Sequence, residues 1–135
     1  MKQLLMKKHL LLGLCIGVLA AAATPARAAV TASKELADGA QFTVDGGTLR
    51  IQFWSPEIVR VTYANTNELP KLKSLSVVAS PEPVHLTRQQ NDQAFILSSQ
   101  DIKVKIDKRT GAATFLDAAG HELLQEANQG RRIAP

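Results

Sequence analysis

Cysteine and histidine are scarce in this sequence of 135 residues. Cys15 is the only cysteine and lies in an apolar N-terminal run, so no internal disulfide can form and the core alone must hold the chain together. The histidines are His9, His85 and His121; His85 and His121 are too far apart in sequence for a zinc site. No Gly-x-Ser-x-Gly motif frames a serine, and no thiol remains beyond Cys15, so no nucleophile for a triad is evident. No phosphate-binding or dinucleotide-binding glycine motif occurs either. We therefore predict no catalytic residue, no metal site and no cofactor.

No apolar run is long enough to span a bilayer, and the longest one has the features of a secretory signal. Residues 10–23 are apolar and uncharged, which is shorter than the roughly 20 residues of a transmembrane helix. Lysines precede this run, and residues 26–28 supply the small-x-small pattern of a cleavage site. We expect residues 1–28 to be a signal peptide, cleaved between Ala28 and Ala29. The mature protein would be periplasmic or extracellular, with no membrane attachment.

Acidic residues are missing from the first 28 positions, and this explains the basic balance of the chain. The sequence has 16 Lys and Arg against 12 Asp and Glu, a net charge of +4. Four of the basic residues, Lys2, Lys7, Lys8 and Arg27, lie in the predicted signal peptide. The mature chain is therefore neutral. It lacks the basic surface that binds phosphate backbones, so nucleic acid is not expected as a partner.

Helical periodicity is also missing, whereas apolar and polar residues alternate with a period of two from residue 42 onward. Leu49, Ile51 and Phe53 share one face of a strand, with Trp54 on the opposite face. Turn-forming residues occupy 45–47, 89–93, 107–111 and 117–120. Strands are predicted at 42–44, 48–54, 58–63, 74–78, 84–87, 95–98, 102–106, 112–116 and 121–124. Short strands at this spacing predict an all-β fold, an antiparallel β-sandwich.

The chain divides into three parts on this basis. Residues 1–28 form the signal peptide, residues 29–41 are small and polar and are expected to be a flexible lead-in, and residues 42–135 form one sandwich domain. The domain is small, so its core is expected to be limited.

Aromatic residues make up only 4% of the sequence, and two of them are candidates for surface recognition. Trp54 and Tyr63 could each stack on a sugar ring or anchor a neighbouring domain.

The spacing of the carboxylates does not suggest catalysis. Asp101 and Asp107 bracket one strand and are roughly 20 Å apart at about 3.3 Å per residue, beyond the roughly 5–9.5 Å between glycosidase carboxylates.

Two stretches carry a resemblance to a known family. Residues 53–63 read Phe-Trp-Ser-Pro-Glu-Ile-Val-Arg-Val-Thr-Tyr, which resembles the F-x-S-P-x-I-(V/I)-R-V-x-Y stretch near the start of family-31 glycoside hydrolases. Residues 102–126 are similar to the family's later pattern of a strand ending in Asp, Thr-Gly, Phe-x-Asp, Gly and Leu-Leu-x-Glu. The run at 74–78 also fits. The resemblance covers residues 42–126, most of the mature chain.

The resemblance implies the N-terminal domain of a retaining α-glucosidase or α-xylosidase. This domain is a β-sandwich of the galactose-mutarotase-like kind, which packs on a catalytic (β/α)₈ barrel and helps shape its pocket. In such enzymes the nucleophile and acid/base aspartates lie on the barrel, in a segment with no counterpart in this sequence. We therefore expect the chain to end before the barrel and to be inactive alone, with the barrel and an α-linked oligosaccharide as partners.

Two expectations remain open. In one, the sandwich is incomplete, and the inner-face residues Leu49, Ile51 and Phe53, or Ile102, Val104 and Ile106, would lack packing partners. The alternative function, from a different class, is a free-standing exported carbohydrate-binding module in which Trp54 and Tyr63 contact the sugar.

Overall fold

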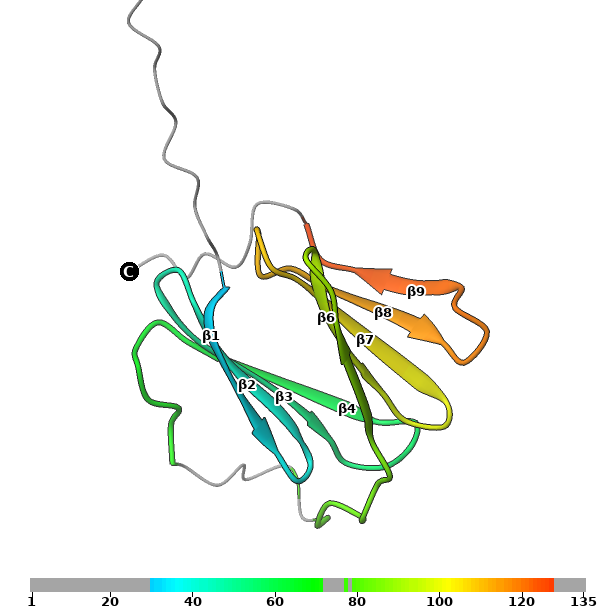
Figure 1. The fold of residues 1–135 in the computed structure, drawn as a ribbon. Coiled ribbons are helices and arrows are strands. Elements are labelled where there is room, and N and C mark those ends of the chain that lie inside the picture. Colours follow the sequence, from blue (N-terminus) through cyan, green and yellow to red (C-terminus); the bar gives the residue numbers. More distant parts are fainter. Residues whose placement is uncertain (1–29, 72–76, 78, 128–135) are drawn as a thin grey trace, which may run out of the picture.

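The computed structural model describes residues 30–71, 77 and 79–127 of the chain (Figure 1). These residues form nine strands in two antiparallel sheets and no helix, which confirms the predicted all-β sandwich. No helical span that could cross a membrane occurs in this part of the chain. The predicted signal peptide, its cleavage site at Ala28 and Ala29, and most of the strand predicted at 74–78 lie outside the described residues.

Each sheet is built from neighbouring strands in sequence order. The first sheet has the order β1-β2-β3-β4, and its strands are β1 (Val30–Leu36), β2 (Gly39–Val44), β3 (Gly47–Phe53) and β4 (Val59–Ala64). The second sheet has the order β5-β6-β7-β8-β9, and its strands are β5 (Thr87–Gln90), β6 (Ala94–Ser98), β7 (Ile102–Asp107), β8 (Ala113–Asp117) and β9 (Glu122–Gln125).

The two sheets enclose a single apolar core (Figure 1). Alternate residues of β3 and β7 point into it, and five side chains have no exposed surface: Leu49, Ile51, Phe53, Val104 and Ile106. The rings of Phe42 and Phe95 contact each other across the core with centroids 5.2 Å apart. The expectation that the inner faces of β3 and β7 lack partners is therefore wrong for these residues, because each sheet covers the other.

Polar contacts also join the two sheets. The Arg88 guanidinium of β5 donates a hydrogen bond to the Leu36 carbonyl at the end of β1. The Ser99 hydroxyl, which follows β6, donates to the Pro56 carbonyl in the β3–β4 connection at 2.6 Å. These contacts satisfy carbonyl groups at sites where the ladders end.

Residues 30–41, the described part of the segment at 29–41, are not the flexible lead-in that their composition predicts. Strand β1 begins at Val30 and pairs along its length with β2, from Val30 opposite Val44 to Leu36 opposite Gly39. The Val30 amide also donates to the Lys108 carbonyl of the second sheet at 3.1 Å. Most side chains of β1 are exposed because it is an edge strand. Backbone hydrogen bonds to β2 hold the strand in place. Its side chains need not alternate between apolar and polar, so periodicity does not reveal it.

The short strand predicted at 84–87 is displaced in the structure. Strand β5 begins at Thr87 and continues through two residues that were predicted as a turn. The turn between β5 and β6 is shorter than the predicted one at 89–93. The Asn91 side chain stabilises it by accepting hydrogen bonds from the Gln93 and Ala94 amides. Elsewhere the turn predictions are confirmed, with Gly46 and Gly111 in the left-handed region at φ 85° and 69°.

Candidate functional site

Trp54 lies directly after β3, on the outer face of the first sheet. The Trp54 backbone makes hydrogen bonds to two loops. Its amide donates to the Ile58 carbonyl, between β3 and β4, and its carbonyl accepts from the Glu82 amide, between β4 and β5, both at 2.8 Å. The ring is half-buried, and the Arg60 guanidinium carbon lies 5.5 Å from its centroid. A cation stacked on an aromatic ring contributes about 0.5–1 kcal/mol at exposed sites. A sugar could use this face only after displacing Arg60.

Tyr63 lies on the other side of the same sheet. It is opposite Leu49 in the β3–β4 ladder, and directly paired residues share a face. Its half-buried ring packs against the core. The structure therefore does not bring Trp54 and Tyr63 together, and the two cannot form one stacking platform.

An apolar surface remains on the last strand of the second sheet. Strand β9 forms the edge of this sheet (Figure 1), and all four of its residues are exposed. Leu123 and Leu124 are 60% and 61% exposed; Leu124 is opposite Phe115 in the β8–β9 ladder, and Leu123 falls at an irregularity of that ladder, next to the pair of Leu116 and Glu122. Ile58, before β4, is 59% exposed. Two large apolar side chains left exposed on an edge strand are typical of a surface that contacts another protein segment.

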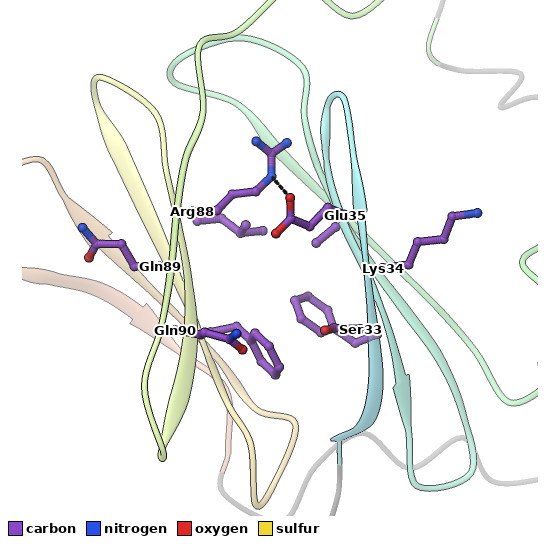
Figure 2. Close-up of a pocket in the computed structure, with 10 residues that line it drawn as sticks. Ser33, Lys34, Glu35, Arg88, Gln89 and Gln90 are labelled. Carbon is purple, nitrogen blue, oxygen red and sulfur yellow. Dashed lines mark ion pairs between the residues drawn. The ribbon is translucent and has the colours of Figure 1, made fainter.

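A cavity of about 190 Å³ lies between the edge strands β1 and β5; we call it the edge slot. Figure 2 shows Ser33 and Glu35 of β1 and Arg88 and Gln90 of β5 directed into it, whereas Lys34 and Gln89 point away. The floor is apolar and consists of Ala40, Phe42, Phe95 and Leu97. Sequence reasoning missed this cavity, because residues 29–41 and 89–93 were interpreted as a lead-in and a turn.

The electrostatics of the edge slot are set by one ion pair. Arg88 Nε lies 3.8 Å from Glu35 Oε2, and the two side chains are 26% and 79% exposed. Arg88 Nη2, at the other end of the guanidinium, donates a hydrogen bond to the Leu36 carbonyl. Nε itself is buried and has no hydrogen-bond partner within the described chain. The slot therefore combines a positioned cation, a carboxylate that is free to move, an amide and a hydroxyl.

The Asp107 carboxylate, at the end of β7, serves the fold. Asp107 accepts hydrogen bonds from the Arg109 and Thr110 amides and from the Thr110 hydroxyl, at 2.8–3.0 Å. These contacts occupy Asp107 in its own hairpin loop. Among the residues that the structure describes, no group of three or more His, Asp or Glu side chains is arranged to hold a metal ion.

The sequence is related to part of a known glycosidase. No protein-family model matches it. Over 89 residues, 66% of the chain, it is 28% identical to Alpha-glucosidase 2 of Bacillus thermoamyloliquefaciens, of which this region makes up 11%.

The fold is shared with two longer proteins of known structure. A GH31 dextranase of Flavobacterium johnsoniae, solved with isomaltotriose, matches 75% of this chain with a TM-score of 0.66 at 14% identity, over 13% of the dextranase. An uncharacterized protein of Listeria monocytogenes EGD-e matches 73% of it with a TM-score of 0.57 at 16% identity, over 9% of that protein. The chain thus spans about a tenth of the length of the relatives that it matches.

The structure and the comparisons together define a class of domain. The described chain is a two-sheet antiparallel sandwich, and it resembles the N-terminal domain of family-31 glycoside hydrolases. This predicted resemblance is confirmed in sequence by the α-glucosidase and in fold by the dextranase.

Proposed function

We propose that this chain is the non-catalytic N-terminal sandwich of an exported family-31 α-glycosidase, an α-glucosidase or α-xylosidase. It packs on a catalytic (β/α)₈ barrel and helps shape the pocket for an α-linked oligosaccharide. The observation that carries the proposal is the match to about a tenth of an α-glucosidase in sequence and of a dextranase in fold.

The exposed leucines of β9 support a docking role. Leu123 and Leu124, neighbours on the same edge strand, leave apolar surface exposed. Covering a large apolar side chain stabilises a complex by about 1.5–3 kcal/mol. We assign the barrel contact to β9, with Ile58 as a further exposed apolar residue of the domain.

Co-expression tests this role directly. The DNA that follows the coding sequence is read, and any barrel that it encodes is expressed with the tagged chain. We expect the barrel to co-purify, and we expect Leu123→Ser with Leu124→Ser to abolish co-purification. Glu122→Ser, on the same strand, is the matched control and should leave it unchanged. The proposal would be contradicted if no barrel-encoding frame followed. It would also be contradicted if the wild type, the double leucine variant and Glu122→Ser all retained the same amount of barrel.

Activity is expected only in the assembled enzyme. The chain alone should not hydrolyse p-nitrophenyl α-glucoside or α-xyloside, because Asp101 and Asp107 lie at the two ends of β7, too far apart to act as a catalytic pair. Turnover by the purified chain that is lost on changing one of its own Asp or Glu residues would contradict this.

Export is part of the proposal and rests on the pattern of residues 1–28. Mass spectrometry of the protein recovered from the periplasm or medium should give a chain that begins at Ala29. A full-length chain retained in the cytoplasm would contradict it.

The closed core favours a second candidate, a free-standing carbohydrate-binding module. Both sheets contribute fully buried residues, such as Ile51 and Val104, as expected of a domain that folds alone. Calorimetry with gluco- and xylo-oligosaccharides, on the wild type and on Trp54→Ala, tests the module with its predicted contact residue. Failure of every oligosaccharide to bind would exclude it.

A further inference from the structure

We propose that the edge slot between β1 and β5 binds one neutral sugar ring, either a monosaccharide or the end of an oligosaccharide. The site is separate from Trp54 and from the apolar surface of β9. The proposed function enters only in the choice of sugars for the test, because the slot itself is built from residues of the described chain.

The polar groups of the slot match the hydroxyl groups of a sugar. The Ser33 hydroxyl and the Gln90 amide can each donate and accept hydrogen bonds, whereas Glu35 only accepts and Arg88 only donates. All four side chains are directed into the gap between the two strands (Figure 2). A sugar hydroxyl both donates and accepts, so this mixed set can bind several hydroxyl groups on one ring.

The floor suits the other half of a sugar ring. Phe42 and Phe95 lie beneath the polar groups, with Ala40 and Leu97 beside them. An apolar floor with a few converging polar groups is the usual composition of a small-molecule site. Carbon-bound hydrogens of a pyranose would lie on the floor while its hydroxyl groups face the edge strands.

Size and charge narrow the choice of ligand. The cavity of about 190 Å³ exceeds the roughly 10–15 Å³ that one water needs and is smaller than the roughly 300–1,000 Å³ typical of sites for drug-sized ligands. It therefore suits a single ring. Arg88 and Glu35 pair with each other and Lys34 points away (Figure 2), so the polar groups directed into the slot carry no net charge, although the Lys108 ammonium lies 4.5 Å from the centroid of the Phe95 ring.

Arg88 supplies the most specific feature of the slot. Its Nε is buried without a hydrogen-bond partner in the described chain, and the nearby carboxylate of Glu35 is 3.8 Å away. The Arg88 side chain is 26% exposed, so a sugar hydroxyl that donates to the exposed Glu35 carboxylate can accept from a guanidinium N–H that faces the slot.

Titration of the full chain with D-glucose and D-xylose, followed by the backbone amide signals in NMR, tests the proposal. We expect saturable shifts in β1 and β5 with a dissociation constant in the millimolar range. Gln90→Ala and Ser33→Ala should each raise that constant several-fold. Both residues are exposed, so these variants should fold. Gln89→Ala is the matched control, since it removes the same side chain from the same strand on the side facing away (Figure 2).

Several outcomes would overturn the proposal. One is the absence of saturable shifts up to tens of millimolar sugar; another is an equal effect of Gln89→Ala and Gln90→Ala. Binding lost in Trp54→Ala but kept in both slot variants would move the sugar to the outer face. Shifts in β1 or β5 on addition of an extended peptide, with none from sugar, would identify strand pairing at an open sheet edge instead. None of these results depends on a barrel partner, so the docking proposal is tested separately.

Discussion

Gly47, at the start of β3, has no room for a side chain. A Cβ atom at this position would lie 1.9 Å from the Ala64 carbonyl oxygen of β4. The contact is with backbone, which can yield only if the β3–β4 ladder shifts. Gly120 provides the contrast. It has a positive φ of 95°, but a Cβ there meets no atom within 4 Å.

We predict that Gly47→Ala destabilises the protein much more than Gly120→Ala. The Gly120 variant should cost about 1–2 kcal/mol, the strain of an L-residue in the left-handed region. The Gly47 variant should cost about 4 kcal/mol or more, since such values come from overpacking and backbone conflict. Urea unfolding followed by Trp54 fluorescence measures both. Equal free energies of unfolding in the two variants would contradict the described β3–β4 contact.

The hairpin between β7 and β8 is stabilised by one carboxylate. Partial burial raises the pKa of Asp107, but hydrogen bonds from Thr110 and Arg109, with the charge of Arg109, together lower it below its ordinary value. The folded-state pKa is therefore below the unfolded value of about 3.9. Ionised Asp107 stabilises the fold above that value, and the contribution is lost as the pH falls through the folded-state pKa.

We predict that Asp107→Asn lowers stability at neutral pH and that the difference from the wild type shrinks below pH of about 4. The amide can still accept hydrogen bonds but has no charge. Thr110→Val removes one donor and leaves the backbone contacts, so it should show an intermediate pH dependence. Urea unfolding across this pH range provides the measurement. A difference that stays constant on acidification would show that ionisation of Asp107 does not contribute.

Strands with one buried face could be predicted from the sequence, whereas the edge strands β1 and β5 could not. β3 and β7 alternate because every second residue enters the core, as with Ile51 and Val104. β1 and β5 lie at the edges of the two sheets and face the edge slot with polar side chains. Their sequences contain no apolar alternation, so β1 was interpreted as a lead-in and half of β5 as a turn. The slot was missed with them, because polar residues on two strands reveal a shared cavity only after the sheets are stacked.

Trp54 illustrates the same limit. Alternation placed it on the face opposite Phe53, and the structure agrees. Its partner Arg60 could not be inferred from spacing alone, since the contact depends on the β3–β4 register in which Gln52 lies opposite Arg60. Tyr63 was grouped with Trp54 as an aromatic residue, although ladder pairing with Leu49 turns it toward the core.

For the whole molecule, the core is shared between the sheets, and the large apolar side chains that the described strands leave exposed lie on the edge strand β9. Phe42 of the first sheet is 1% exposed and contacts Phe95 of the second. Most large apolar side chains of the described strands are covered in this way, whereas Leu123 and Leu124 are not. A domain can therefore be stable alone and still have a surface that a partner would cover. The two candidate functions, a sandwich docked on a barrel and a free-standing carbohydrate-binding module, differ in the partner but rely on the same core.

The shared core predicts that both sheets unfold in a single transition. Phe42→Ala removes a ring that joins the layers and should cost about 3–5 kcal/mol. Phe115→Ala is the control. Phe115 is only half-buried at the border of the core, so its loss should cost less. Trp54 fluorescence reports on the first sheet, and hydrogen exchange of the β7 and β8 amides reports on the second. In Phe42→Ala both signals should move to lower urea together. If the amides of β7 and β8 stayed protected after the Trp54 signal had changed, the sheets would be separate folding units.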